Sequence, residues 1–316
     1  ERLRQVFTFQ PLLVGGNPFQ TTSIYLLIHW LERKWGVFFP KGGTGAIVKG
    51  LVRLLEELGA EIHYNSPVER IEVKDGGVRS VHTSNGKQID CDLVVSNADP
   101  VVAYSKWIDR GLRSKHSDRS LSRRRSSMGL FVAYFGSKKL YPELAHHTIV
   151  MGPRYKGLLD DIFNRRVLSE DFSLYLHAPT RSDPGLAPEG HEAFYVLSPV
   201  PNNKSGINWE KTGAEYFDRI MTSLDRGVIP GIKSNLVTSK FITPDYFETS
   251  LRSADGAGFG LEPRFSQSAY FRFHNRSEDI RGLYFVGAST HPGAGVPGVL
   301  CSAKVLDRMI PPAPVV

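Results

Sequence analysis

Residues 283–306 combine a strand signal, a glycine-rich loop and a helix signal, and they restrict the fold more than any other part of the chain. The loop matches the pattern G-x-G-x-x-G at Gly293, Gly295 and Gly298. A dinucleotide-binding unit needs these glycines directly after the strand and an acidic residue about 20 positions later, on a second strand. Here the strand signal ends at Gly287, with five residues between it and the triplet, and the sequence stops at Val316. The pattern therefore does not predict a Rossmann unit at this position.

A helix that begins near Pro297 is predicted instead, because a proline in the first helical turn has no amide hydrogen that would need a partner. Free amides and the positive end of the helix dipole favour negative charge, by roughly 0.3–1 kcal/mol per contact. The loop at residues 295–298 is therefore a candidate binding site for an electron-rich group. A plain turn and helix that cap a sheet is the alternative interpretation.

The composition is that of an ordinary globular protein, with 41% hydrophobic and 22% charged residues. A chain of 316 residues is long enough for two domains, each with its own core. The densest apolar run, residues 24–31, is interrupted by His29 and is much shorter than the roughly 18 residues that cross a bilayer. We therefore expect a protein that is soluble or bound to a membrane surface.

The start of the chain, Glu1-Arg2-Leu3-Arg4, is neither a secretory signal nor an initiating methionine. We expect the sequence to begin inside a longer gene product. The two cysteines, Cys91 and Cys301, do not have the spacing of a metal site or a redox pair. The sequence thus predicts no metal site, and a reducing cytoplasm is the simplest setting.

Much of the net charge of +7 comes from a serine-rich basic cluster formed by Arg110, Arg113, Lys115, Arg119, Arg123, Arg124 and Arg125. Anionic lipid headgroups attract such a cluster by about 1 kcal/mol per basic residue near the surface. Nucleic acid would attract it too, but no base-reading aromatic pattern accompanies the arginines. A membrane surface is therefore the preferred partner, and a solvated loop between two domains is the alternative.

Periodicity divides the chain into three regions. Two helices are expected first, one from the cap signal Asn17-Pro18 to Gly36 and one over residues 47–58. Short strands follow at residues 61–64, 68–74, 78–83 and 93–96. The aromatic-rich middle has strands at 128–135, 172–178 and 194–200 and a helix at 209–226. We interpret this middle as a second domain inserted into the first.

Several segments resemble a known family. The run "GVFFPKGGTGAIVKGLVRLLEELGAEIHYNSPVERIEV", followed after a turn by "DLVVSNADP", is similar to the central segment of flavin-dependent amine oxidases and their desaturase relatives. Four more segments narrow the resemblance to the bacterial and fungal type of phytoene desaturase, which dehydrogenates carotenoid precursors: "LAHHTIVMGPRY", "FSLYLHAPTRSDPGLAPEG", "YVLSPVPN" and "LYFVGASTHPGAGVPG". The resemblance runs from about residue 15 to about residue 303.

Three features depart from this family. The N-terminal strand-glycine-helix unit that would hold the FAD pyrophosphate is not in the sequence, Phe273 stands where a proline often follows the arginine, and residues 119–125 are unusually basic. The resemblance implies an α/β, FAD-linked two-domain fold with its N-terminal Rossmann unit missing and a substrate domain of mixed sheet and helices. The implied segments are 1–36 (helical part of the substrate domain), 37–108 (FAD-binding), 109–272 (substrate-binding) and 273–316 (C-terminal FAD-binding).

The resemblance also implies site residues. The closing strand, loop and helix would lie against FAD, and the adenine would contact the backbone of Val68. The implied cofactor contacts are Val68, Gly42, Gly43, Thr44, Gly287, Ala288, Gly295, Val296, Pro297 and Gly298. A helix N-terminus aimed at the flavin ring favours the negative charge of the reduced form.

The implied substrate is a long polyene such as phytoene, which would lose a hydride from an allylic carbon to flavin N5 and a proton from the neighbouring carbon. Removing this substrate from water is favourable by about 0.8 kcal/mol per CH₂, but the substrate starts in lipid, so its transfer from a bilayer to the protein is nearly neutral. The enzyme must therefore contact a membrane to collect the substrate and hold it in a tunnel as apolar as the bilayer. A quinone or oxygen would be the final electron acceptor. Among the histidines 146, 147, 177 and 291, only His291, inside the closing loop, is a candidate catalytic residue.

Three other functions remain open at this point. A carotenoid isomerase of the same fold would cycle its flavin without net oxidation. A flavin-free prenyl- or lipid-binding chaperone would carry its ligand unchanged. An incomplete chain would have no activity.

Overall fold

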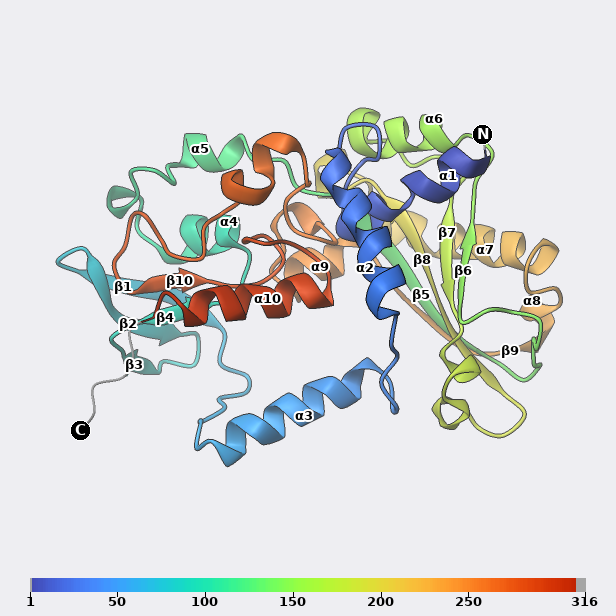
Figure 1. Ribbon diagram of the computed structural model, residues 1–316, viewed down its shortest axis with the longest axis horizontal. Coiled ribbons are helices and arrows are strands. Elements are labelled where there is room, and N and C mark those ends of the chain that lie inside the picture. Colours follow the sequence, from blue (N-terminus) through green and yellow to red (C-terminus); the bar gives the residue numbers. More distant parts are fainter. Residues whose placement is uncertain (1, 311–316) are drawn as a thin grey trace. The chain divides into compact units, whose positions relative to one another are not determined.

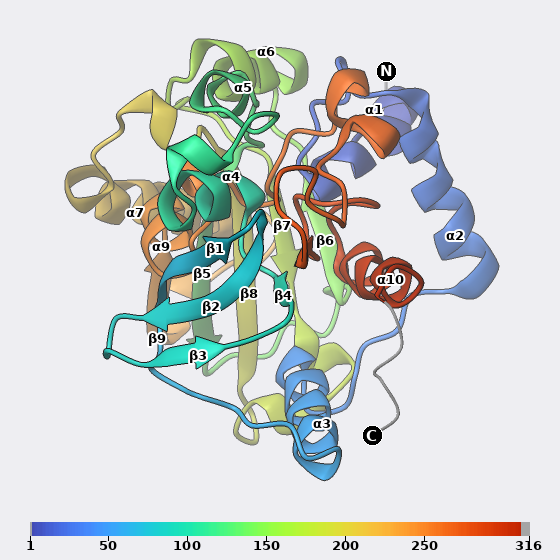
Figure 2. The same cartoon turned by 90° about the vertical axis from the view of Figure 1, so that its left-hand side faces the viewer.

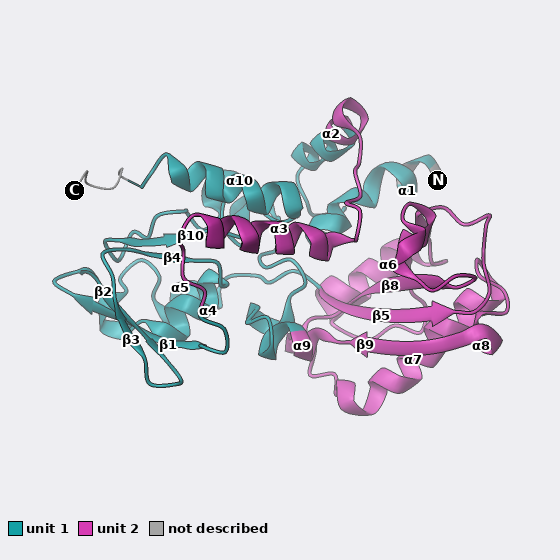
Figure 3. Ribbon diagram, turned by 90° about the horizontal axis from the view of Figure 1, so that it is seen from below, with its two compact units in different colours: residues 1–29, 63–128, 247–316 teal, residues 30–62, 129–246 magenta. Residues whose placement is uncertain are grey.

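The structure, a computed structural model, describes residues 2–310 and divides them into two compact units (Figures 1 and 3). Within the described residues, unit 1 comprises 2–29, 63–128 and 247–310, and unit 2 comprises 30–62 and 129–246. These divisions differ from the predicted segment boundaries at 37, 109 and 273. Residues 37–62 lie in unit 2 and residues 247–272 in unit 1, and the roles assigned to the segments stay predictions.

Unit 2 is built on a five-stranded sheet in the order β6-β7-β8-β5-β9. Its strands are β5 (Gly129–Ser137), β6 (His147–Val150), β7 (Leu174–His177), β8 (Glu192–Val200) and β9 (Leu236–Ile242). Every pairing in it is antiparallel, so the sheet is not the mixed one expected from the sequence. Antiparallel sheets commonly bury one face and leave the other available.

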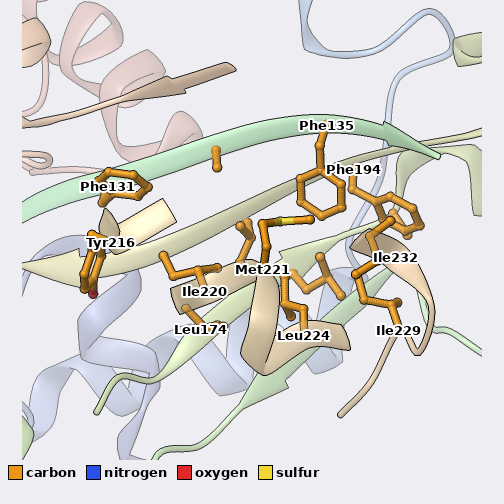
Figure 4. Close-up of a cluster of buried hydrophobic side chains, with 14 of the residues drawn as sticks. Phe131, Phe135, Leu174, Phe194, Tyr216, Ile220, Met221, Leu224, Ile229 and Ile232 are labelled. Atoms are coloured by element: carbon orange, nitrogen blue, oxygen red, sulfur yellow. The ribbon is translucent and has the colours of Figure 1, made fainter. Parts of the chain in front are cut away.

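The two faces of this sheet differ because side chains alternate along each strand. In β8 every second residue is buried, from Glu192 through Phe194 and Val196 to Val200. This face packs against helix α7 (Trp209–Arg226), and their shared hydrophobic core includes Phe131, Phe194, Tyr216, Ile220, Met221 and Leu224 (Figure 4). The other face of the sheet contributes to a pocket described below.

Unit 1 contains two small sheets (Figure 2). Strands β1 (Val68–Lys74), β2 (Gly77–Thr83) and β3 (Gln88–Asp90) form an antiparallel meander, and β4 (Val94–Ser96) pairs in parallel with β10 (Leu283–Phe285). A core that includes Ile71, Tyr104, Leu261, Leu283 and Phe285 joins the meander to the closing strand. The remaining helices are α1 (Arg2–Thr8), α2 (Leu27–Trp35), α3 (Thr44–Glu57), α4 (Pro100–Val102), α5 (Asp118–Ser122), α6 (Tyr155–Asp160), α8 (Ile232–Asn235), α9 (Pro244–Thr249) and α10 (Val296–Asp307).

Two expected elements are wrong. Residues 61–64 form no strand, and the helix expected after Asn17-Pro18 begins only at Leu27, after a 3₁₀ turn at Ser23–Leu26. The Asn17 side chain instead accepts the amide of Phe19 at 3.0 Å and closes a local turn. Such side-chain bonds to nearby backbone compete with helix formation, which a search for caps alone does not reveal.

Unit 1 also contains a buried carboxylate whose charge depends on backbone hydrogen bonds. Asp279 accepts the amides of Ser114, Lys115 and His116 at 3.1, 2.8 and 3.0 Å, and its side chain is 1% exposed. Burial alone raises the pKa of Asp279, but these donors overcome it and hold the pKa at about 2. The carboxylate therefore anchors residues 114–116.

We expect Asp279→Asn to lose about 2 kcal/mol of unfolding free energy at pH 7. A depressed carboxylate pKa stabilises the fold above the unfolded value near 4, and this contribution disappears as the pH falls through about 2. Urea unfolding at pH 7 and at pH 2.5 should show the difference from wild type shrinking with acidity. Asp92→Asn, at an exposed position, is the control; an equal difference at both pH values would contradict the assignment.

Candidate functional site

The loop after β10 folds tightly around Gly287, one of the predicted cofactor contacts. Gly287 has φ +107°, and a Cβ at this position would lie 2.6 Å from Asn97 Oδ1. Its amide donates to Ser302 Oγ at 2.9 Å, and its carbonyl accepts the Thr290 hydroxyl at 2.8 Å. Both backbone groups of Gly287 are bonded within the protein, so neither is free to form a hydrogen bond with a ligand. The glycine instead allows another group to approach its backbone closely.

The same loop is held from behind by a buried arginine. Arg272 is 3% exposed and donates to the carbonyl oxygens of Thr290 (3.1 Å), Gln267 (3.4 Å), Leu261 (3.4 Å) and Ala288. Burial lowers the pKa of Arg272. Ala288, the second predicted contact in this loop, thus has its carbonyl engaged by the guanidinium, and the path of residues 288–290 is set by a side chain outside the loop.

The first turn of α10 is open, as a ligand-binding helix terminus requires. A Cβ on Gly295, where φ is +94°, would meet no atom within 4 Å. Val296 is 62% exposed and Pro297 is exposed as well. A Cβ on Gly298, in contrast, would lie 2.7 Å from the Gly293 carbonyl oxygen, so the loop folds closely over this turn. The predicted contacts at 295–298 therefore form one surface, with the twelve-residue helix behind it.

His291, the predicted catalytic residue, borders a pocket of about 1020 Å³ in unit 1. Its amide donates to the Phe273 carbonyl at 3.0 Å, and its own carbonyl accepts Asn275 Nδ2 at 3.0 Å. Within residues 2–310, Nδ1 of His291 is buried without a hydrogen-bond partner. The backbone is thus firmly placed, and the catalytic role stays a prediction.

Val68 is the first residue of β1 and is half-buried. Its side chain packs against the unit 1 core that also contains Leu283 and Phe285 of β10. The predicted adenine contact and the closing strand are therefore built on the same core.

The other predicted contacts, Gly42, Gly43 and Thr44, belong to unit 2. Gly42 and Gly43 have φ of +81° and +78°, and the Gly42 amide donates to Asp183 Oδ2 at 2.7 Å. Gly43 and Thr44 border a pocket of about 1000 Å³, which we call the sheet pocket. The predicted site residues thus divide between the two units.

The sheet pocket lies on the face of the unit 2 sheet opposite helix α7. Its floor consists of residues that alternate with the buried core positions, among them Val132, Tyr134, Tyr175, His177, Ala193, Tyr195, Leu197 and Val237. Tyr195 lies directly across from Tyr134 on β5 and from His177 on β7. Strand register thus gathers a largely aromatic surface that no single segment of the sequence contains.

The histidines and tyrosines of this floor are uncharged at neutral pH, but the basic side chain of Lys240, which is paired with Tyr134 between β9 and β5, also borders the pocket. Burial lowers the pKa of His177 to about 4, with the neighbouring imidazoles adding to the effect, and burial also lowers the pKa of His147. Burial raises the pKa values of Tyr175 and Tyr195. The aromatic part of the floor can therefore accept an apolar ligand at little desolvation cost, whereas Lys240 keeps its side of the pocket polar.

Sequence reasoning missed two residues that hold the closing loop from outside it. Arg272 carries no local signal, because its four partners lie up to 18 positions away. Asp99 could have been found, since an acidic residue before Pro100 is a helix N-cap signal. It caps Val101 at 2.8 Å and accepts the Ser289 hydroxyl at 2.9 Å, and burial raises the pKa of its carboxyl.

The basic cluster is partly neutralised within unit 1. Four of its members form ion pairs: Arg110 and Arg113 with Asp118, Lys115 with Glu278, and Arg125 with Glu262. The other three, Arg119, Arg123 and Arg124, border a hollow of about 350 Å³ together with Ser117 and Ser266. Within this smaller part, the Arg124 guanidinium already donates to the Phe271 carbonyl at 3.2 Å and lies over the Phe273 ring.

None of the helices in the described part of the chain combines the length and apolar character needed to traverse a bilayer.

Comparison with known proteins places this geometry in a family. A family model described as "Flavin containing amine oxidoreductase" matches residues 1–304. A phytoene desaturase (lycopene-forming) of Pseudescherichia vulneris is 50% identical over 98% of the chain and 63% of its own length. A phytoene desaturase (lycopene-forming) of Pantoea ananas is 48% identical over 96% and 62%. The chain thus spans about three fifths of the length of these curated relatives.

Among solved structures, an oxidoreductase from Methanosarcina mazei superposes with a TM-score of 0.65 at 18% identity, covering 95% of this chain and 63% of that one. This likeness concerns the fold alone. With the family match, it confirms the α/β fold class that the sequence predicts.

Proposed function

Because the chain belongs to the family of flavin containing amine oxidoreductases, we propose that it forms part of an FAD-dependent carotenoid desaturase. The substrate would be a phytoene-like polyene, as the names of the similar proteins suggest. The reaction would remove a hydride from an allylic carbon and a proton from its neighbour. The observation that carries the proposal is the sheet pocket, a surface in unit 2 that is rich in aromatic and apolar side chains.

The closing loop and helix fit a flavin. The open turn at Gly295–Pro297 presents the positive end of a twelve-residue helix, and Gly287 allows close approach of the chain. When bound, FAD would supply the acceptor for the hydride. The protein's contribution would be to orient the ring, with residues 295–298 favouring negative charge at its edge and Val68 near the adenine. His291 stays our candidate for a proton-transfer residue.

The substrate would lie on the sheet pocket, whose volume of about 1000 Å³ is at the upper end for small-molecule sites. A hydrocarbon that starts in lipid gains little by entering an apolar pocket, so the site needs walls as apolar as the membrane. Tyr134, Tyr195 and Leu197 supply such walls.

A polyene dissolved in lipid also requires contact with a membrane surface. We propose that Arg119, Arg123 and Arg124 provide it, because their hollow is suited to an anionic headgroup. A peripheral protein on the cytoplasmic side would have access to a quinone or to oxygen as electron acceptor.

The proposal is tested with the complete protein that contains this chain, produced in cells that accumulate phytoene. The expected products are polyenes with additional conjugated double bonds, identified by mass and absorbance. A geometric isomer of unchanged mass would identify an isomerase instead. Unchanged phytoene bound to a flavin-free protein would identify a lipid carrier and overturn the enzyme assignment.

Filling the sheet pocket should block the reaction without unfolding the protein. Ala193 lies half-buried on the pocket face of β8, so Ala193→Trp would occupy volume meant for substrate. We expect product formation to fall at least tenfold, about 1.4 kcal/mol in the barrier, with flavin content and melting temperature close to wild type. Ala60→Trp adds the same bulk at an exposed position and should have no effect. Full activity of Ala193→Trp would place the substrate elsewhere.

A further inference from the structure

Three histidines from two segments converge at the rim of the sheet pocket. His147 on β6 and His177 on β7 are directly paired across the sheet, with ring centroids 5.4 Å apart. His146 precedes the strand in a bend, which lets its ring turn toward both: its centroid is 4.3 Å from that of His147 and 4.6 Å from that of His177. In a regular strand, adjacent side chains would point to opposite faces.

The outer nitrogens of two of these rings are held by hydroxyl groups. His146 Nδ1 is 2.6 Å from Ser182 Oγ, and His147 Nδ1 is 2.7 Å from the Tyr175 hydroxyl. These contacts orient both rings and leave their Nε2 atoms for the cluster. His146 Nε2 lies 2.7 Å from His177 Nε2, and within the described chain His177 Nδ1 is buried without a hydrogen-bond partner.

We propose that His146, His147 and His177 form a binding site for a divalent transition-metal ion such as Zn²⁺. One nitrogen from each ring lies within 4.8 Å of the others. A tetrahedral ion with bonds of about 2.0–2.1 Å sets its ligand nitrogens about 3.3 Å apart. On binding, the 2.7 Å pair of His146 and His177 would open slightly, and any pair of ligand nitrogens near the 4.8 Å limit would have to close. No acidic residue belongs to the cluster, and an all-imidazole ligand set suits Zn, Cu, Ni or Fe rather than Mg or Ca.

The fourth ligand position would face the sheet pocket, because His147 and His177 both border it. On another side of the histidine cluster, the Phe39 ring lies edge-on to the rings of His146 and His177. Its centroid is 4.8 Å from that of His146 and 5.6 Å from that of His177. A metal site with three protein ligands and one open position can exchange a ligand. In a structural site the protein fills all four positions. This site goes beyond the proposed desaturase, whose chemistry uses no metal.

The test is a calorimetric titration of the untagged chain with Zn²⁺ at pH 7.5. We expect one ion per chain, and at least a hundredfold weaker binding in His147→Gln and in His177→Gln. His191→Gln is the matched control, because His191 borders the same pocket but bonds its own loop through the Glu189 carbonyl, at 2.9 Å. It should bind like wild type.

Ser182→Ala removes a supporting hydroxyl while keeping all three ligands, so it guards against variants that simply misfold. We expect its Zn²⁺ affinity to fall about tenfold, as is typical when an outer partner of a ligating histidine is lost. Co²⁺ should give the visible absorption of a four-coordinate ion. No binding by the wild-type chain, or equal losses in His147→Gln and His191→Gln, would overturn the site and leave a hydrogen-bonded histidine cluster. The titration contains neither flavin nor polyene, so its outcome is read separately from that of the desaturase experiment.

Discussion

Replacing Arg272 by methionine is expected to lower the free energy of unfolding by about 3–5 kcal/mol. The guanidinium is almost completely buried and donates to four carbonyl oxygens, those of Leu261, Gln267, Ala288 and Thr290. Methionine fills similar volume but donates no hydrogen bond, so these acceptors would be left without their donor. Urea unfolding followed by tyrosine and tryptophan fluorescence measures the loss.

Arg272→Lys separates the charge from the geometry. Lysine keeps a positive charge but offers a point donor in place of the planar fork, so it should restore only part of the stability. If lysine restored all of it, charge and not the four-way hydrogen bonding would hold residues 288–290. If methionine cost less than about 1 kcal/mol, the role assigned to Arg272 would be wrong.

Gly287→Ala should destabilise the chain by about 2–5 kcal/mol and deform the start of the closing loop. Two costs add: a side chain at φ +107° is strained by about 1–3 kcal/mol, and overpacking costs a similar amount. The overpacking arises because the new Cβ would lie 2.6 Å from Asn97 Oδ1. In the complete protein we expect the variant to lose bound flavin as well.

Two further variants divide these costs. Gly295→Ala has a similar positive φ, +94°, but its Cβ would meet open space, so it should show the strain alone. Asn97→Gly removes the opposing side chain and should recover the overpacking part in the double variant with Gly287→Ala. A double-mutant cycle gives this coupling directly. Additive effects in the cycle would show that Asn97 does not set the requirement for glycine at 287.

The sequence predicted the elements whose signals are local. Helix α7 has the predicted bounds of Trp209–Arg226, and strand β1 those of Val68–Lys74. Helix α10 begins at Val296, one residue before the proline that indicated it. In each case the apolar periodicity and the turn residues that act locally agree with the final fold, so short-range information was sufficient.

Elements that depend on distant partners were missed. Strand β6 has four residues and β9 is largely exposed, and each sits at an edge of the unit 2 sheet, where pairing with β7 or β5 supplies the stability that composition does not. The cluster of His146, His147 and His177 went unrecognised for the same reason. The adjacent histidine pair was visible, but its third member lies 30 residues beyond His147, and only strand register brings it near.

The amino-acid sequence alone determined the family, the α/β class and the turn in front of α10, because motifs, periodicity and turn chemistry act over a few neighbouring residues. Only the tertiary structure decided which polar groups meet. In the folded chain both backbone groups of Gly287 form hydrogen bonds, and Arg272 lies behind the loop. Most members of the basic cluster form ion pairs with carboxylates. The physical reason is that a hydrogen bond or an ion pair depends on distances between segments remote in sequence, and packing of the whole chain sets those distances.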